Sequence, residues 1–451
     1  MRTKSFTLFT ILVTLILALS ACQPTTPPST TPPLVTEPPA TQPPATQPPA
    51  TQPPATEKPP AAPVEITYWH QYDKANAALL DILVGEFNAA HPDIKVNAVM
   101  QPSYDEYKTL IKTSILGGTT PDLASVDLIW VPEYVNDAAL QSLNDFISSD
   151  SQFNIDDFYP MLTNYDLMGG NRYGLPFTVN NMQLIWNKDL FTAAGLDPEK
   201  PPKTWDEMKA MSEQCSDSTK GIVGFEFYTQ PVGEGITWQF QVWLWAAGGE
   251  FLNADNTAAA FNSPEGLNAL TFVSDMLQGH GSAPGPWGAF GDQKACMQLD
   301  GSWLFGYRKG APFQWGIAPV PAPAGGTTAS NTGGEHLIMF KNSTHKEAVW
   351  EFMKFLTSTE TQLRLDMETG FLPIIKSVGE NQNYLNWVNV TEPRMLPFIQ
   401  GMPYAHTRPA TPFYNQISEA FSREIQGAML GTASPAEALA AAETAVNDIL
   451  K

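Results

Sequence analysis

The chain contains few of the residues from which reactive centres are usually built. It has 3 cysteines and 6 histidines in 451 residues, and the histidines show no metal-binding spacing. The sequence contains no Gly-x-Ser-x-Gly, no His-Glu-x-x-His and no phosphate-binding loop, and no carboxylate pair stands out as acid and nucleophile. We therefore expect a protein that is not an enzyme, with no metal and no cofactor.

Positive charge is also scarce. The chain has 25 basic residues against 46 acidic ones, a formal net charge of −21. This balance argues against binding to nucleic acid and against electrostatic docking to anionic lipid. We favour the simpler interpretation that the acidic charge belongs to the soluble surface of an exported protein. Cys215 and Cys296 are far apart in the sequence, and the sequence alone leaves open whether they form a disulfide.

Long apolar runs are confined to the N-terminus. Arg2 and Lys4 precede an apolar stretch, residues 6–19, that is too short to span a bilayer. The following Leu-Ser-Ala-Cys, which ends at Cys22, resembles a bacterial lipobox. We predict a lipoprotein signal peptide over 1–22, with Cys22 as the lipid anchor on the outer face of the bacterial cell membrane or in the periplasm. The alternative is an ordinary signal peptide with an incidental cysteine.

Residues 23–64 consist almost entirely of Pro, Thr, Ala and Gln, with an Ala-Thr-Gln-Pro-Pro repeat. Proline pairs favour polyproline II, and the segment has no apolar face to bury. We predict a disordered linker that reaches roughly 130 Å at about 3.1 Å per residue. Such a linker would hold a folded body away from a membrane.

The body, residues 65–451, is longer than a single hydrophobic core usually covers, which favours two lobes. Apolar periodicity predicts alternating strands and helices at its start, an α/β fold with mainly parallel sheets. The expected elements are strands at 65–69, 94–99 and 122–130 and helices at 76–90 and 104–116. Ligands of such sheets bind beyond the carboxyl ends of the strands, here at 69–73 and 127–130.

Several motifs along the body resemble one family. They are Gly118-Thr-Thr-Pro-Asp122, Trp186-Asn-Lys-Asp-Leu-Phe191, Pro202-Lys-Thr-Trp-Asp-Glu207, Asp300-Gly-Ser-Trp303 and Gly370-Phe-Leu-Pro373. In this order and spacing they resemble family 1 extracellular solute-binding proteins, the carbohydrate-binding subunits of ABC importers that include maltose-binding protein.

The resemblance implies a two-lobe periplasmic-binding-protein-like fold of type II with a three-segment hinge. Lobe 1 would comprise 65–178 plus 325–374, and lobe 2 would comprise 179–324 plus 375–451. The chain would act as a monomer that closes around a sugar and delivers it to permease subunits of the transporter.

Aromatic residues make up 11% of the chain, with 12 tryptophans. An indole can cover the apolar face of a pyranose while charged side chains hold its hydroxyls. By the resemblance, Trp303 and Trp238 are the candidate stacking residues. Either ring could instead pack in the core of the second lobe.

The first lobe and the hinge supply further candidates. Asp73 and Lys74 match an acidic and a basic sugar contact of relatives, although Asp73 could merely cap a helix. Asp127 and Trp130 lie at the third strand's end, with a core role favoured for Trp130 over Asp127. At the first crossing, Asn180 or Asn181 is a candidate because amides between apolar neighbours need partners.

The second crossing and the C-terminal part add three more candidates. Gly334 would let a ligand approach the backbone closely. Glu335 would favour a hydroxyl-rich or cationic ligand if it faces the cleft, and it could equally face solvent. Arg408 could grip hydroxyls or a phosphate, but we favour a structural pairing with a carboxylate.

A mono- or oligosaccharide is the expected ligand. A glycerol-phosphate-type polyol is the alternative, but Phe371 lacks the tyrosine hydroxyl of such relatives and Arg408 is the one obvious anion partner. A secreted glycosidase and an adhesive surface module are less favoured interpretations.

Overall fold

A computed structural model describes residues 62–72, 74–308 and 310–451, with only the backbone of Lys74 and Ala75. The predicted signal peptide, Cys22, nearly all of the 23–64 linker and Asp73 lie outside the described residues. The described part belongs to one compact unit, residues 60–451. None of its helices is long and apolar enough to cross a membrane, and its His, Cys, Asp and Glu side chains form no metal-binding group.

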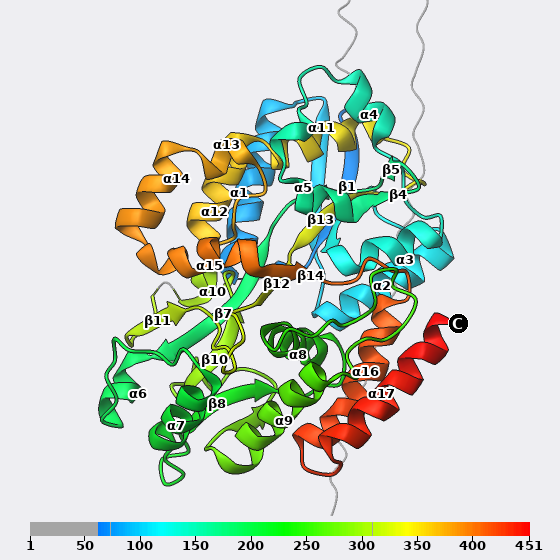
Figure 1. The fold of residues 1–451 in the computed structure, drawn as a ribbon. Helices are drawn as coiled ribbons and strands as arrows, with labels where there is room; N and C mark the ends of the chain where they lie inside the picture. The colour runs from blue at the N-terminus through cyan, green and yellow to red at the C-terminus, as the bar shows by residue number, and fades with distance from the viewer. Residues whose placement is uncertain (1–61, 73, 309) are drawn as a thin grey trace, which may run out of the picture. The chain divides into compact units, whose positions relative to one another are not determined.

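The described chain alternates strands and helices (Figure 1). The strands are β1 (Val64–His70), β2 (Ile94–Met100), β3 (Leu123–Asp127), β4 (Leu167–Met168), β5 (Asn171–Arg172), β6 (Leu175–Pro176), β7 (Asn180–Asn187), β8 (Val223–Tyr228), β9 (Ala283–Gly285), β10 (Ala295–Gly301), β11 (Trp315–Ala318), β12 (Ser330–Gly333), β13 (Glu335–Met339) and β14 (Ala405–Thr407). The α-helices are α1 (Lys74–Ala90), α2 (Tyr104–Gly117), α3 (Val131–Asn136), α4 (Asn144–Ser149), α5 (Pro160–Thr163), α6 (Lys188–Ala193), α7 (Trp205–Cys215), α8 (Glu234–Ala246), α9 (Pro264–Gly279), α10 (Leu304–Arg308), α11 (Lys346–Leu356), α12 (Thr359–Thr369), α13 (Lys376–Gly379), α14 (Gln382–Asn386), α15 (Leu396–Gly401), α16 (Tyr414–Met429) and α17 (Pro435–Leu450).

The strands form two large sheets. A five-stranded sheet has the order β2-β1-β3-β13-β6, and a seven-stranded sheet has the order β14-β12-β7-β10-β8-β9 with β11 also paired to β7. In the first sheet β1 is parallel to β2 and β3, whereas β13 is antiparallel to both β3 and β6. In the second, β7 is antiparallel to β10, β11 and β12, whereas β8 is parallel to β9 and β10. Both sheets are therefore mixed, where we expected mainly parallel ones.

Local sequence explains the ends of the early elements. A capping box of Ser103 and Glu106 starts α2, and Gly118, in the left-handed conformation at φ 65°, ends it. The third strand stops at Asp127, because the Asp127 carboxylate accepts a hydrogen bond from the amide of Ile129 and caps a 3-10 helix over Leu128–Trp130. The expected strand at 122–130 is thus shorter than predicted, and this turn points Asp127 toward other elements.

The chain passes between the two sheets at defined points. It leaves the five-stranded sheet after β6 and enters the other sheet at β7, across residues 177–179. It returns from β12 to β13 through Gly334 alone. After α12 a segment at 370–375 leads to α13, whose Val378 packs with residues of β7 and α10. These passages fall within the three hinge crossings that the resemblance implies, at 176–185, 319–339 and 370–377, while the lobe boundaries stay a prediction.

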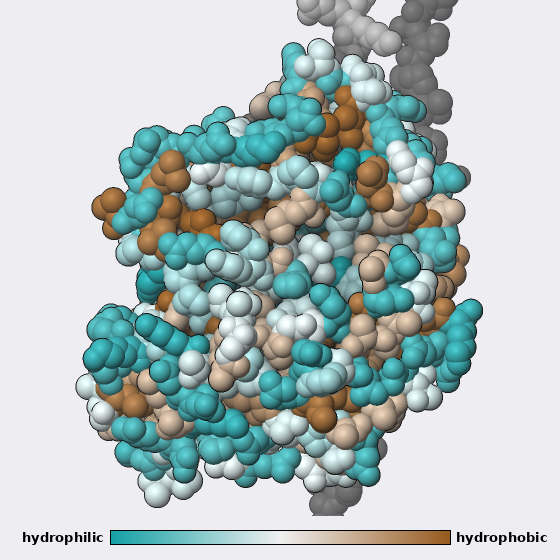
Figure 2. All heavy atoms as spheres, in the orientation of Figure 1, coloured by the Kyte–Doolittle hydropathy of each residue, from teal (hydrophilic) through white to brown (hydrophobic). Residues whose placement is uncertain are grey.

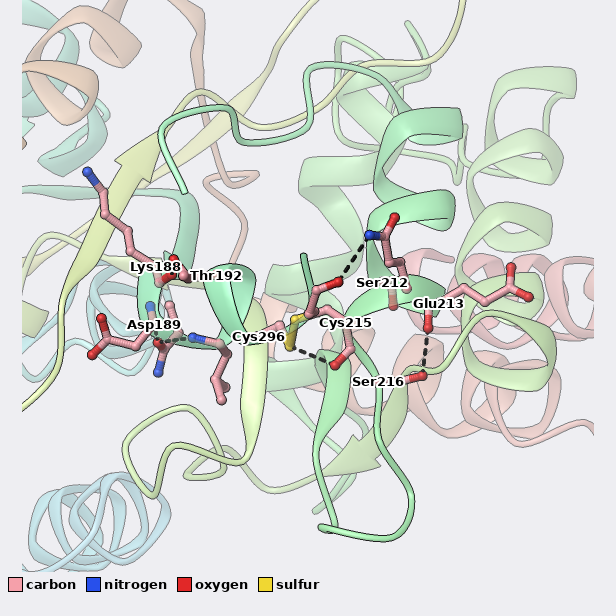
Figure 3. The surroundings of a disulfide bond; sticks show 12 residues. Lys188, Asp189, Thr192, Ser212, Glu213, Cys215, Ser216 and Cys296 are labelled. Atoms are coloured by element: carbon pink, nitrogen blue, oxygen red, sulfur yellow. Dashed lines mark hydrogen bonds between the residues drawn. A yellow bond between two sulfur atoms is a disulfide. The ribbon is translucent and has the colours of Figure 1, made fainter. Parts of the chain in front are cut away.

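A disulfide joins Cys215, the last residue of α7, to Cys296 on β10 (Figure 3). The sequence left this pairing open. Both cysteines are buried and lie among residues that pack around the seven-stranded sheet. The helices α16 and α17 pack side by side against the same core (Figure 1). Polar residues cover most of the face seen in Figure 2, with apolar ones in separate patches.

Candidate functional site

A cavity of about 240 Å³ lies between the first turn of α2 and the segment that follows β8. Tyr104 and Asp105 line it from α2, which follows a strand of the five-stranded sheet. The opposite wall is formed by residues at or after the ends of β8 and β9, two strands of the seven-stranded sheet. These residues are Tyr228, Pro231, Val232, Gly233, Glu234, Gly235, Trp238 and Trp287. The cavity thus has aromatic walls and two carboxylates, and its two sides come from different sheets.

Two tryptophans meet beside this cavity. The ring centroids of Trp238, on α8, and Trp303, directly after β10, are 5.5 Å apart with an interplanar angle of 49°. Both rings are half-buried. Gly333 permits the arrangement, because a Cβ there would lie 2.7 Å from the Trp238 ring and 2.8 Å from Oδ1 of Asn180. The structure therefore brings Asn180, Trp238 and Trp303 together, three residues that the sequence had selected.

Several buried polar atoms around these rings have no hydrogen-bond partner among the described residues. They are Oδ1 of Asn180 and the indole Nε1 atoms of Trp238 and Trp287. Buried polar groups normally have partners, and each orphaned donor or acceptor costs about 1–3 kcal/mol. Two donors and one acceptor next to aromatic rings suit a guest that carries both hydroxyls and an apolar face.

Arg408 is held by carboxylates from both sides of the cavity. Its side chain is 0% exposed, and its Nη2 and Nη1 atoms donate to the Asp127 carboxylate at 2.8 and 3.2 Å. Nη1 also donates to Oε1 of Glu234 at 2.8 Å. Burial raises the pKa of Glu234, and the nearby guanidinium opposes that rise. Arg408 thus has the structural pairing that we favoured, and Asp127 is its partner, which leaves neither charge free.

Glu335 belongs to a network of neutral donors at the second crossing. Its carboxylate accepts hydrogen bonds from the Thr178 hydroxyl, from the Tyr72 hydroxyl at 3.3 Å and from Nε2 of Gln71 at 3.3 Å. Burial raises the pKa of Glu335, and the bond from Thr178 counteracts this most. Glu335 also lies opposite Asp127 in the β13–β3 register. It faces these protein groups rather than open solvent, and a contact with a ligand stays a prediction.

Two predicted site residues have structural surroundings instead. Trp130 is 0% exposed and packs against Tyr104 at 4.9 Å between ring centroids, so its indole offers no face to a ligand. Asn181 is equally buried and donates to the carbonyl of Phe398 at 2.7 Å. Trp130 and Asn181 are therefore core residues, because neighbouring side chains and backbone already surround them.

The remaining predictions concern Gly334 and the start of α1. Gly334 has φ 141°, and a Cβ there would lie 2.1 Å from the carbonyl oxygen of Thr178. The missing side chain thus serves close packing of two chain crossings, and a contact with a ligand stays a prediction. Lys74 is the first residue of α1, and because its side chain lies outside the described part of the structure, its contact with a ligand stays a prediction.

Of the residues that line the cavity, the sequence selected only Trp238; the residues that it missed include Tyr104, Glu234 and Trp287. Each follows the carboxyl end of a strand, namely β2, β8 and β9, within a few residues. Ligand sites of α/β sheets lie at such ends. That rule, applied to every strand and not only to the first and third, could have found them.

Comparison with known proteins agrees with this architecture. The model of the bacterial extracellular solute-binding protein family matches residues 72–363, and the chain therefore belongs to this family. The crystal structure of a cyclic α-maltosyl-1,6-maltose binding protein from Arthrobacter globiformis is 41% identical, with a TM-score of 0.76, and the match covers 86% of this chain and 99% of that one.

Two sequence relatives differ in the ligand that their names state. A maltotriose-binding protein of Pyrococcus abyssi is 24% identical over 77% of this chain and 74% of its own length. The sn-glycerol-3-phosphate-binding periplasmic protein UgpB of Pectobacterium atrosepticum is 24% identical over 86% of this chain and 92% of its own length. The family and the two-sheet solute-binding fold are thus confirmed.

Proposed function

We propose that this chain is the extracytoplasmic binding subunit of an ABC importer and captures a neutral oligosaccharide between its two lobes. The observation that carries the proposal is the Trp238–Trp303 pair, which lies with orphaned polar atoms beside a cavity whose walls follow strands of both sheets. Aromatic rings cover the apolar face of a sugar, and Tyr104, Glu234 and Asn180 can exchange hydrogen bonds with its hydroxyls. The 41% identical relative binds cyclic α-maltosyl-1,6-maltose, as its name states.

The charge of the site favours a neutral ligand over a phosphate. Arg408 is neutralised by Asp127 and Glu234, and Asp105 adds a further carboxylate to the cavity wall. A phosphate brought into this site would meet uncompensated negative charge at low dielectric, which is costly. Glycerol phosphate, the ligand named for one relative, remains the second candidate and enters the test below.

The proposed location rests on the N-terminus. Residues 1–22 would direct export, Cys22 would carry the lipid, and residues 23–64 would serve as a linker to the outer face of the membrane. Conversion of Cys22 to Ala should move the protein from the membrane fraction to the soluble fraction. If the Cys22→Ala protein still fractionates with membranes, another segment anchors it. The permease subunits are the proposed partners, and the body would act as a monomer.

Isothermal titration of the mature chain tests the ligand class. Cyclic α-maltosyl-1,6-maltose and maltotriose should give saturable heats, and glycerol 3-phosphate should give none. Small-angle scattering with the tighter sugar should show a smaller radius of gyration, because closure brings the lobes together. Binding of glycerol 3-phosphate without binding of either sugar would replace the proposal by its alternative. No binding to any of the three would contradict both.

A further inference from the structure

Arg408 lies over the face of one of the two site tryptophans. Its guanidinium carbon is 4.6 Å from the centroid of the Trp238 ring. The same ring contacts Trp303, with 5.5 Å between the two ring centroids. A guanidinium over an indole is attracted by the ring's electron-rich face, and this attraction strengthens where water is excluded. The position of Arg408 therefore bears on the position of a ring that lines the cavity.

The guanidinium itself has little freedom. Asp127, at the end of β3, holds its two terminal nitrogens, and Glu234, at the start of α8, holds one of them as well. The Asp127 carboxylate is fixed in turn by the Tyr104 hydroxyl at 2.7 Å, and Glu234 by the Ser418 hydroxyl at 2.6 Å. A planar fork with this many partners has a single orientation.

From these contacts we infer that Arg408 is a positioning residue for sugar binding. It fixes the Trp238 ring in the orientation that a sugar meets, and it takes that orientation from Asp127, a residue of the opposite sheet. Through Arg408, the position of Asp127 at the end of a strand in the five-stranded sheet therefore determines the orientation of the Trp238 ring, which lies on the side of the seven-stranded sheet. The effect on affinity rests on the proposed function, whereas the effect on ring orientation does not.

The variant Arg408→Lys tests the inference, because lysine keeps the charge but has no planar fork to hold two carboxylates and cover a ring. We expect the dissociation constant for cyclic α-maltosyl-1,6-maltose to rise about tenfold, the equivalent of one lost cation–π contact. We also expect a weaker far-ultraviolet circular dichroism couplet from the Trp238–Trp303 pair. The couplet is obtained as the difference from Trp238→Phe.

A second arginine provides a matched control. The Arg394 guanidinium lies 4.1 Å from the Trp315 ring centroid and donates to both Glu392 oxygens at 2.5 and 2.7 Å. Neither Arg394 nor Trp315 lines the site cavity. Arg394→Lys makes the same chemical change elsewhere in the fold, so it should leave both the dissociation constant and the Trp238 couplet as in the wild type.

The two readouts separate the possible results. Arg408→Lys with wild-type couplet and affinity would overturn the inference, even if the variant unfolds at lower urea. A wild type that binds no sugar would refute the proposed function, while a diminished couplet in Arg408→Lys would still support the positioning role. If Arg408→Lys does not fold, Glu234→Gln replaces it and should diminish the couplet in the same direction. An unchanged couplet in folded Glu234→Gln would then overturn the inference.

Discussion

Replacement of Asp300 by asparagine should stabilise the protein at neutral pH. Asp300 lies near the end of β10, three residues before Trp303. Its carboxylate accepts hydrogen bonds from Nε2 of Gln298 at 2.7 Å and from the Gly301 amide at 2.8 Å. Burial is the main influence on its titration and raises the pKa of Asp300 to about 6, from a usual value of 3.8.

The magnitude follows from that difference in pKa. The folded protein holds the Asp300 proton more tightly than the unfolded chain does, so the free energy of unfolding decreases as the pH rises from about 4 to about 6. At 1.36 kcal/mol per pKa unit, the loss is about 3 kcal/mol at most, and it is complete above pH 6. An asparagine side chain never ionises, and it can keep the bond from the Gly301 amide. Asp300→Asn should therefore recover much of this free energy at pH 7.5.

Urea unfolding followed by tryptophan fluorescence at pH 4, 5, 6 and 7.5 measures the effect. The gain from Asp300→Asn should be largest at pH 7.5 and vanish near pH 4. Asp150→Asn is a control of opposite sign, because the hydrogen bond from Lys354 lowers the pKa of Asp150 to about 2. That variant should lose stability at pH 7.5. A gain from Asp300→Asn that is the same at every pH, or a loss at pH 7.5, would refute the reasoning.

Three further predictions concern the disulfide, the site and the hinge. Replacing Cys215 and Cys296 by serine should lower the free energy of unfolding by about 4 kcal/mol, because the disulfide closes a loop between residues that are 81 positions apart. An unchanged midpoint in urea unfolding would contradict this prediction. Trp303→Ala should weaken sugar binding about tenfold in calorimetry, the loss of one stacked ring, and a wild-type dissociation constant would place the indole outside the site. Gly334→Ala should lower the free energy of unfolding by more than about 3 kcal/mol, because the added Cβ would lie 2.1 Å from the Thr178 carbonyl oxygen and the φ of residue 334 is 141°. A urea midpoint equal to that of the wild type would contradict this prediction.

The fold could be predicted well from local patterns and from the family resemblance. The strand and helix expected at 94–99 and 104–116 match β2 and α2 to within one residue at each end. The strand expected at 122–130 was too long because an apolar run is equally typical of a strand and of a buried 3-10 turn. The strand ends where the Asp127 side chain caps such a turn. The strands predicted at the start of the body are parallel as expected. The antiparallel strand β13 was not predicted, because it joins the first sheet from a distant part of the sequence.

The site was harder to predict because its contacts are long-range. Trp238 and Trp303 were proposed from the resemblance and Asn180 as an amide between apolar neighbours, and the structure brings the three residues together. The partners of Arg408 lie 281 and 174 positions away in the sequence, and no pattern near Arg408 identifies them. The disulfide between Cys215 and Cys296 was left open for the same reason, since two cysteines without a framework specify no geometry.

The disulfide also makes this protein convenient as a reporter. Because Cys215 and Cys296 form a disulfide with each other, residues 62–72, 74–308 and 310–451 contain no free thiol. A single cysteine introduced at Asp105, an exposed residue on the cavity rim, would then be the one attachment point in that part of the chain for an environment-sensitive dye. Its emission would report the filling of the cavity directly, without a second label and without removal of native cysteines from the body.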